Sequence, residues 1–170
     1  MDISEVFARL KARMLEGMVF HDEMCRYFDF LGLCGYRELH RDHYNEETEG
    51  YARLCEYYMH HFNKLIPHTT MERPDVIPES WHMYSMKDVD AGTKRNAVRS
   101  AFQKWVEWES ATKDLYEDMC GELLNNGEIA AEKFISHYVK DVDDELAEAT
   151  DTHIKLETIG YDLQFIMSEQ

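Results

Sequence analysis

Residues 97–124 carry apolar side chains at the spacing of an amphipathic helix, and one carboxylate stands among them. The shared face consists of Val98, Phe102, Trp105, Thr112, Tyr116, Met119 and Leu123. Glu109 falls on the same face. An unpaired buried carboxylate costs several kcal/mol or takes up a proton, so Glu109 requires partners on other helices. This requirement restricts the chain to folds that bring polar groups to the level of Glu109.

Three other segments show the same helical periodicity, at about residues 3–30, 36–66 and 128–158, and the helix around Glu109 extends over about 93–124. Glycine-containing turns at 31–35 and 125–127 separate the helices of each pair, so each pair forms an antiparallel hairpin. All three prolines lie in one long connection, 67–92, and a short fifth helix is expected at 161–168. The sequence therefore predicts one all-α domain of residues 1–170, a four-helix bundle with a long middle connection.

In the first predicted hairpin, polar residues on the apolar faces lie at one height. His21 lies 12 residues before the turn centre, and His43 and Glu47 lie on either side of the position 12 residues after it. At 1.5 Å per residue, this height is roughly 18 Å from the turn. Because neighbouring helix axes lie about 8–10 Å apart, we expect His21 and Glu47 to approach each other in the interior. They would share a metal ion or form an ion pair that raises the pKa of His21.

In the second predicted hairpin, Glu109 lies 17 residues before the turn centre, and Asp141 and Glu145 lie on either side of the matching position after it. Their height is roughly 25 Å from that turn. If the connection crosses the whole bundle, the two turns lie at opposite ends and the two heights coincide within a bundle roughly 42 Å long. If both turns lay at the same end, the heights would differ by about 7 Å. We therefore expect a crossover, with parallel helices at 36–66 and 93–124.

Carboxylates from three helices with two nearby histidines are a donor set typical of a dinuclear metal site in a helical bundle. Oxygen-rich sites with some imidazole suit iron or manganese, with zinc as an alternative. Bound cations also offset the repulsion between clustered carboxylates. The sequence thus predicts a metal site formed by Glu47, Glu109, Asp141, Glu145, His21 and His43.

A metal-free bundle is the alternative interpretation of the same residues. In it Glu109 is protonated or bonded to a tyrosine, and Asp141 and Glu145 turn outward by a small rotation of their helix. Residues away from the predicted site are interpreted as structural or solvated, with His61 as a hydrogen-bonded core histidine and Glu16, Glu23 and Glu46 as surface charges.

The composition narrows the class of partner. A formal net charge of −16 opposes binding to nucleic acid or anionic membranes and suits a protein that attracts cations. No stretch approaches the roughly 20 apolar residues of a membrane span, and the first residues lack the basic and apolar regions of a signal peptide. The four cysteines include no Cys-x-x-Cys pair and are interpreted as reduced thiols. We therefore expect a cytoplasmic protein.

Three segments resemble the ferritin-like superfamily of di-iron carboxylate bundles: CGYRELHRDHYNEE (34–47), AFQKWVEWE (101–109) and FISHYVKDVDDE (134–145). The resemblance implies a ferritin-like four-helix bundle with a long crossover, and the segment after Gly160 is similar in position to the fifth helix of ferritins. It implies metal ligands at Glu47 and Glu109, and further acidic positions of the fourth helix at Asp141 and Glu145.

The chain also departs from the pattern of the family. Gly50 stands where the E-x-x-H motif of the second helix has His, and Met14 stands where the first helix has Glu. Val142 occupies a position where the family often has Glu or Gln. His21 and His43 are the histidines that offer nitrogen ligands from other positions.

Two functions from different classes follow. The first is a non-haem di-metal protein that binds iron or manganese and oxidises the metal with dioxygen or peroxide, as a ferroxidase-like oxidoreductase. The second is a metal-free ferritin-like bundle with a structural or protein-interaction role. Metal ions are the expected partners, together with further copies of the chain in a homo-oligomer, although no residue pattern specifies a cage or assigns a catalytic residue.

Overall fold

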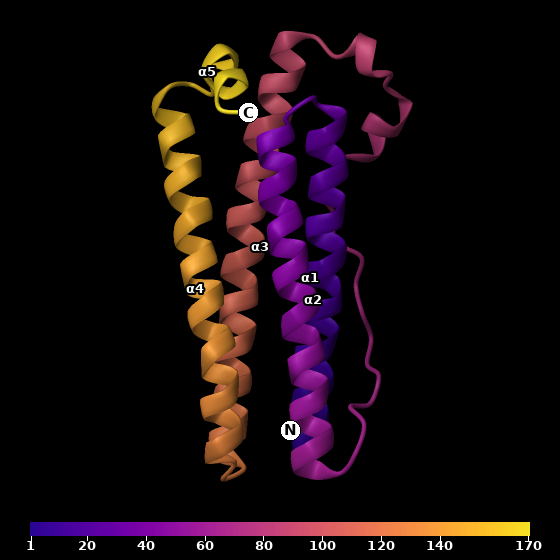
Figure 1. Cartoon of the computed structure of the whole chain (residues 1–170), viewed down its shortest axis with the longest axis vertical. Coiled ribbons are helices and arrows are strands. Elements are labelled where there is room, and N and C mark those ends of the chain that lie inside the picture. The colour runs from indigo at the N-terminus through magenta and orange to yellow at the C-terminus, as the bar shows by residue number, and fades with distance from the viewer.

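Four amphipathic segments form the long helices of the protein, in a computed structural model that describes residues 1–170 (Figure 1). They are α1 (Ile3–Phe30), α2 (Cys34–Phe62), α3 (Ala91–Asn125) and α4 (Ile129–Thr158), and the short α5 (Leu163–Ser168) follows. No β-strand is present. This architecture confirms the predicted all-α four-helix bundle with a short C-terminal helix.

Local capping groups and backbone conformations set the helix ends. Asp2 caps α1, because its side chain accepts a hydrogen bond from the Glu5 N–H while the Glu5 side chain accepts one from the Asp2 N–H. α2 begins at Cys34 and ends at Phe62, rather than spanning residues 36–66 as predicted. It ends early because Asn63 adopts the left-handed conformation, with φ of 55°.

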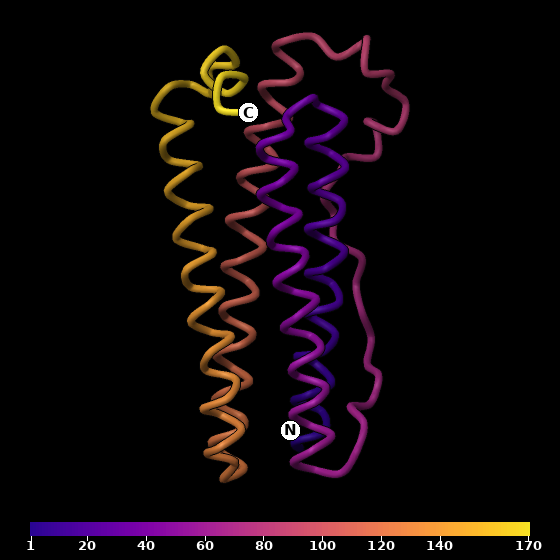
Figure 2. The backbone as a smooth tube through the Cα atoms, in the orientation of Figure 1, coloured from indigo at the N-terminus to yellow at the C-terminus, as the bar shows by residue number.

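The connection between α2 and α3 runs along the outside of the bundle, as the tube in Figure 2 shows. α2 and α3 are therefore parallel, and the α1–α2 and α3–α4 turns lie at opposite ends, in agreement with the prediction. The connection contains two short 3-10 helices, η1 (Glu79–Met83) and η2 (Met86–Asp88). Trp81 packs edge-on against Tyr27 of α1, and Lys104 of α3 donates a hydrogen bond of 3.0 Å to the Val76 carbonyl. These contacts hold the connection against the helices.

A polar layer at mid-height divides the apolar core into two clusters. One cluster includes Phe28, Phe102 and Trp105, and the other includes Leu10 and Tyr58 toward the opposite end. The two hairpins pack against each other through α1 and α3, and a cleft lies between α2 and α4. None of the helices combines the length and the apolar character that crossing a membrane requires.

Candidate metal centre

The polar layer contains buried or largely buried side chains from all four long helices. His21 on α1 and Glu109 on α3 are completely buried, and His43 on α2 is 5% exposed. The Glu145 side chain on α4 is 14% exposed. The structure therefore brings four of the six predicted site residues to one level, as the count of residues from the two turns predicts.

Three of these side chains form an inner group, which we call the inner triad: His21, Glu109 and Glu145. One potential ligand atom of each lies within 4.8 Å of the others. His21 Nε2 lies 3.4 Å from Glu109 Oε1, and the Trp105 indole N–H donates a hydrogen bond of 3.2 Å to the same oxygen. His21 Nε2, Glu109 Oε2 and Glu145 Oε2 are buried and have no hydrogen-bond partner. Such atoms are rare in folded proteins, and an ion is one of the groups that satisfies them.

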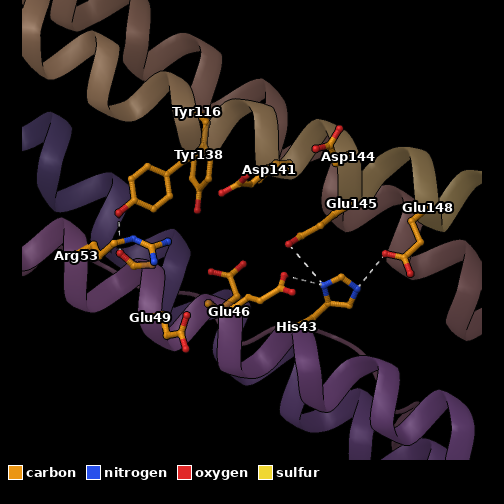
Figure 3. Close-up of a pocket in the computed structure, with 13 residues that line it drawn as sticks. His43, Glu46, Glu49, Arg53, Tyr116, Tyr138, Asp141, Asp144, Glu145 and Glu148 are labelled. Atoms are coloured by element: carbon orange, nitrogen blue, oxygen red, sulfur yellow. Dashed lines mark hydrogen bonds and ion pairs between the residues drawn. The ribbon is translucent and has the colours of Figure 1, made fainter.

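A second group, the outer triad, consists of His43, Glu46 and Glu145, again with ligand atoms within 4.8 Å of one another. His43 Nδ1 lies 3.5 Å from Glu145 Oε1 and 3.6 Å from Glu46 Oε2. His43 Nε2 lies 3.4 Å from Glu148 Oε2 on the other side of the ring (Figure 3). Because Glu145 belongs to both triads, the two groups are adjacent and share a carboxylate.

His40 contacts His21 of the inner triad at Nδ1, the ring nitrogen that does not face Glu109. Its Nδ1 lies 3.0 Å from His21 Nδ1, so one of the two nitrogens carries a proton and the other accepts it. When His21 is the donor, its Nε2 presents a lone pair toward Glu109. His40 is 1% exposed and also packs against Trp105. It was missed from the sequence, although its spacing of three residues from His43 places both on one face of α2.

Burial controls the protonation of the inner triad. Burial and the positive charge of His43 lower the pKa of His21 to about 3. Burial raises the pKa of Glu109 to about 7, even though His43 and the Trp105 N–H favour its charged form. His21 is therefore neutral at neutral pH, and its contact with Glu109 is a polar contact rather than an ion pair.

The outer triad differs from the inner triad in that its histidine is protonated at neutral pH. Burial on its own would lower the pKa of His43, but the neighbouring carboxylates of Glu145, Glu148 and Glu109 outweigh it and raise the pKa to about 9. Burial raises the pKa of Glu145, and the negative charge of Glu109 adds to this increase. Ionisation of several carboxylates in the centre is therefore unfavourable, and a bound cation would offset its free-energy cost.

Comparisons with known proteins identify the fold. No protein-family model and no curated protein matches the sequence. An open-pore ferritin from the archaeon Archaeoglobus fulgidus has a TM-score of 0.79 and 18% sequence identity, over 99% of this chain and 94% of that chain. A humanized archaeal ferritin has a TM-score of 0.78 and 20% identity, over 96% of this chain and 89% of that chain. The chain has the ferritin-like fold.

Gly50 is one position at which this ferritin-like bundle differs from the motif of the family. At Gly50, which stands where the motif has His, an added Cβ would lie 3.2 Å from Tyr138 Cε1. The Tyr138 hydroxyl also donates a hydrogen bond of 2.8 Å to the Gly50 carbonyl. Tyr138 thus occupies the space that a histidine at position 50 requires. Histidines enter the layer from positions 21 and 43 instead.

Glu47 lies beside both triads but belongs to neither. A Cβ at Gly17 would be 2.8 Å from Glu47 Oε1, so Glu47 rests against α1 at the only residue type without a Cβ. The predicted approach of His21 and Glu47 is wrong, because the neighbours of His21 are His40, His43 and Glu109. Gly17, which Glu47 contacts, lies one helical turn before His21. The Glu47 carboxylate is therefore displaced along α1 from the His21 ring. The predicted rise in the pKa of His21 is also wrong, because burial lowers it.

Other residues lie elsewhere than the sequence suggests. Asp141 is exposed at the α2–α4 cleft and is in neither triad. Glu46, interpreted as a surface charge, is 63% exposed, yet its carboxylate reaches His43. His61, interpreted as a core histidine, is exposed and stacks on Tyr57.

The α2–α4 cleft has a volume of about 370 Å³. Its lining consists of the outer triad together with Glu47, Glu49, Gly50, Arg53, Tyr116, Tyr138, Asp141, Val142, Asp144 and Glu148.

Proposed function

We propose that this ferritin-like protein binds two divalent metal ions, iron or manganese, in the polar layer. The observation that carries the proposal is the pair of triads joined by Glu145. Five buried atoms of the triads have no hydrogen-bond partner: His21 Nε2, both ring nitrogens of His43, Glu109 Oε2 and Glu145 Oε2. An unsatisfied buried ligand set is costly unless a cation or protons neutralise it. The donors are imidazole nitrogen and carboxylate oxygen with no thiolate, a set that suits iron or manganese.

Each triad holds one ion in this proposal. His21 Nε2 and Glu109 would hold the inner ion, His43 and Glu46 would hold the outer ion, and Glu145 would contribute to both. In this proposal His21 Nδ1 is protonated and donates a hydrogen bond to His40 Nδ1, 3.0 Å away, which leaves His21 Nε2 free for the metal. Glu47 and Asp141, which the sequence placed among the ligands, line the cleft but belong to neither triad.

The ferritin-like fold supports iron as the physiological metal, because the matched solved structures are ferritins. A pair of iron ions supplies one-electron redox chemistry toward dioxygen or peroxide, with ferrous iron as the substrate of a ferroxidase-like reaction. The chain's part is to hold the ions side by side and to keep the inner ligands away from water, which the complete burial of His21 and Glu109 achieves. We also propose a homo-oligomer, on the same comparison.

Metal analysis and titration test the proposal. Protein purified from cells grown with iron, manganese and zinc should contain metal, and anaerobic calorimetric titration of the chelator-treated protein with Fe²⁺ or Mn²⁺ should give two ions per chain. Glu145→Gln should weaken both sites, because Glu145 is shared. Glu107→Gln, at an exposed position of α3, is the matched control and should bind as the parent does. A parent that binds neither metal above the background of the control buffer contradicts the proposal.

A metal-free bundle remains the second candidate, and one observation favours it. Burial raises the pKa of Glu109 to about 7 and lowers that of His21 to about 3, so the inner triad can be neutral without a cation. In this case the layer has a structural role, and the protein acts as a scaffold or interaction module. Replacement of Glu109 by an apolar residue distinguishes the two candidate functions experimentally.

A further inference from the structure

The α2–α4 cleft connects the candidate metal centre with solvent. The cleft lining includes Glu46 and Glu49 of α2 and Asp141, Asp144 and Glu148 of α4 (Figure 3). Arg53 is the only basic residue other than His43 in the lining, and it lies beside Tyr138 at the far end from His43. The half of the cleft near His43 is therefore lined by carboxylates without a compensating lysine or arginine.

His43 lies at the inner end of this acidic cleft. Its side chain is 7% exposed and lines the cleft, and neither ring nitrogen has a hydrogen-bond partner. The three carboxylates around it lie at 3.4–3.6 Å, close enough to surround an ion together with the ring. The buried His43 imidazole, whose nitrogens lie 3.4–3.6 Å from carboxylates without forming a hydrogen bond, is an observation separate from the acidic residues at the mouth of the cleft.

Exposure decreases in steps from the cleft to the inner triad. The side chains of Glu46 and Glu148 are 63% and 46% exposed, those of Glu145 and His43 are 14% and 7% exposed, and those of His21 and Glu109 are fully buried. Neither His21 nor Glu109 lines the cleft. The inner triad is therefore separated from the cleft by Glu145, which belongs to both triads.

We propose that the α2–α4 cleft is the route by which divalent cations reach the centre, and that the outer triad fills before the inner triad. This inference rests on the proposed function and adds a path and an order to it. Carboxylates at the mouth concentrate cations, as grooves of one charge do for ligands of the opposite charge. An ion then binds His43 and Glu46, and Glu145, with one oxygen unpaired, carries it toward His21 and Glu109.

Loading kinetics test the route. Co²⁺ is mixed with metal-free protein in a stopped-flow instrument, and its visible absorption bands report coordination. The double variant Glu49→Gln/Asp144→Asn removes two negative charges from the cleft lining without removing a triad residue or a carboxylate that contacts His43. We expect two Co²⁺ ions per chain at saturation, as in the parent, with a loading rate about tenfold lower and less dependent on salt.

The double variant Glu107→Gln/Asp118→Asn is the matched control. It removes the same charge from exposed positions of α3 that do not line the cleft, and it should load within about twofold of the parent rate. Equal loading rates for the mouth variant and the control would overturn the proposed route, even if both bind two ions. A parent that binds no Co²⁺ would overturn the proposed function and the route together, so the two failures are distinguishable.

The order of filling has its own readout. Parent loading should show a fast phase and a slow phase, one for each triad. His21→Gln removes a ligand of the inner triad only, so it should abolish the slow phase and retain the fast phase. If His21→Gln abolishes the fast phase instead, the inner triad fills first and the proposed order is wrong.

Discussion

His40 and His21 face each other through their Nδ1 atoms at 3.0 Å, inside a core where neither ring contacts solvent. Only one proton fits between the two nitrogens, so the tautomers of His40 and His21 are linked. The position of this proton determines whether His21 Nε2 offers the centre a lone pair or a proton. The nearest supporting residue of the centre is thus a second histidine rather than a carboxylate.

Replacing His40 should therefore weaken metal binding without unfolding the protein. His40→Phe keeps an aromatic ring against Phe28 and Trp105 but cannot accept the His21 proton. Loss of a residue that orients a metal ligand typically costs about 10–100-fold in affinity, and we expect this range for Fe²⁺ or Mn²⁺ in anaerobic titration. His40→Gln, whose amide oxygen can accept the proton, should recover part of the loss. His61→Phe, at an exposed position of the same helix, is the control, and equal affinities for the His40 and His61 variants would rule out this role.

The stability of the metal-free protein should depend on the protonation of Glu109. The pKa of Glu109 is about 7 in the folded protein against an ordinary value of 4.5, so the unfolded chain ionises first as the pH rises. The stabilisation due to Glu109 is fully present below about pH 4.5 and is lost as the pH rises through about 7. A shift of this size corresponds to about 3 kcal/mol.

Urea unfolding of the chelator-treated parent and Glu109→Gln measures this contribution. The glutamine side chain of the variant is close in shape to a protonated glutamate and cannot ionise. The free energy of unfolding of the parent should therefore fall relative to the variant by about 3 kcal/mol between pH 4.5 and 7. Glu47, whose pKa is raised by burial and by the charges of Glu145 and Glu109, is present in both proteins, so its burial affects both profiles alike. Parallel pH profiles would show that Glu109 ionises normally in the fold.

Much of this fold could be predicted from the sequence, because helix periodicity and residue counts carry it. The rise per residue and the positions of the two turns place His21, His43, Glu109 and Glu145 at one height. The same count requires the connection to cross the bundle, which it does. These quantities depend on the backbone alone, so no knowledge of side-chain packing is needed.

The detailed ligand arrangement could not be predicted, because it depends on rotation about each helix axis. Adjacent residues such as Glu46 and Glu47 point about 100° apart, and only the packed structure shows that Glu46 reaches His43 while Glu47 turns toward Gly17. An acidic helix surface gives no signal that selects one of them. The early end of α2 was missed for a similar reason, since the left-handed conformation of Asn63 is one of several that asparagine adopts.

Glu109→Leu should distinguish a metal protein from a metal-free bundle. If the centre binds metal, the variant should lose the inner ion or both ions, because Glu109 is a ligand of the inner triad. If the bundle is metal-free, an apolar residue of similar size replaces a buried ionisable group, which is commonly neutral or stabilising by about 1–4 kcal/mol. Metal content and the free energy of unfolding at pH 8 are measured on the same preparations. Unchanged metal content in the variant would exclude Glu109 as a ligand.

Gly17 and Gly121 form a natural pair for testing the close packing of Glu47 against α1. Both glycines lie inside long helices, where Gly→Ala ordinarily stabilises by about 1 kcal/mol. A Cβ at Gly121 would meet nothing within 4 Å, so Gly121→Ala should show this gain in urea unfolding. A Cβ at Gly17 would lie 2.8 Å from Glu47 Oε1 and 3.0 Å from Glu47 Cδ, so the carboxylate must move out of its place beside the triads. Overpacking costs about 1–3 kcal/mol, so Gly17→Ala should show no gain or a net loss.

In a Glu47→Ala background the carboxylate that blocks a Cβ at position 17 is absent, and Gly17→Ala should then stabilise by about as much as Gly121→Ala does. A full gain from Gly17→Ala with Glu47 intact would mean that Glu47 does not rest against α1 in solution.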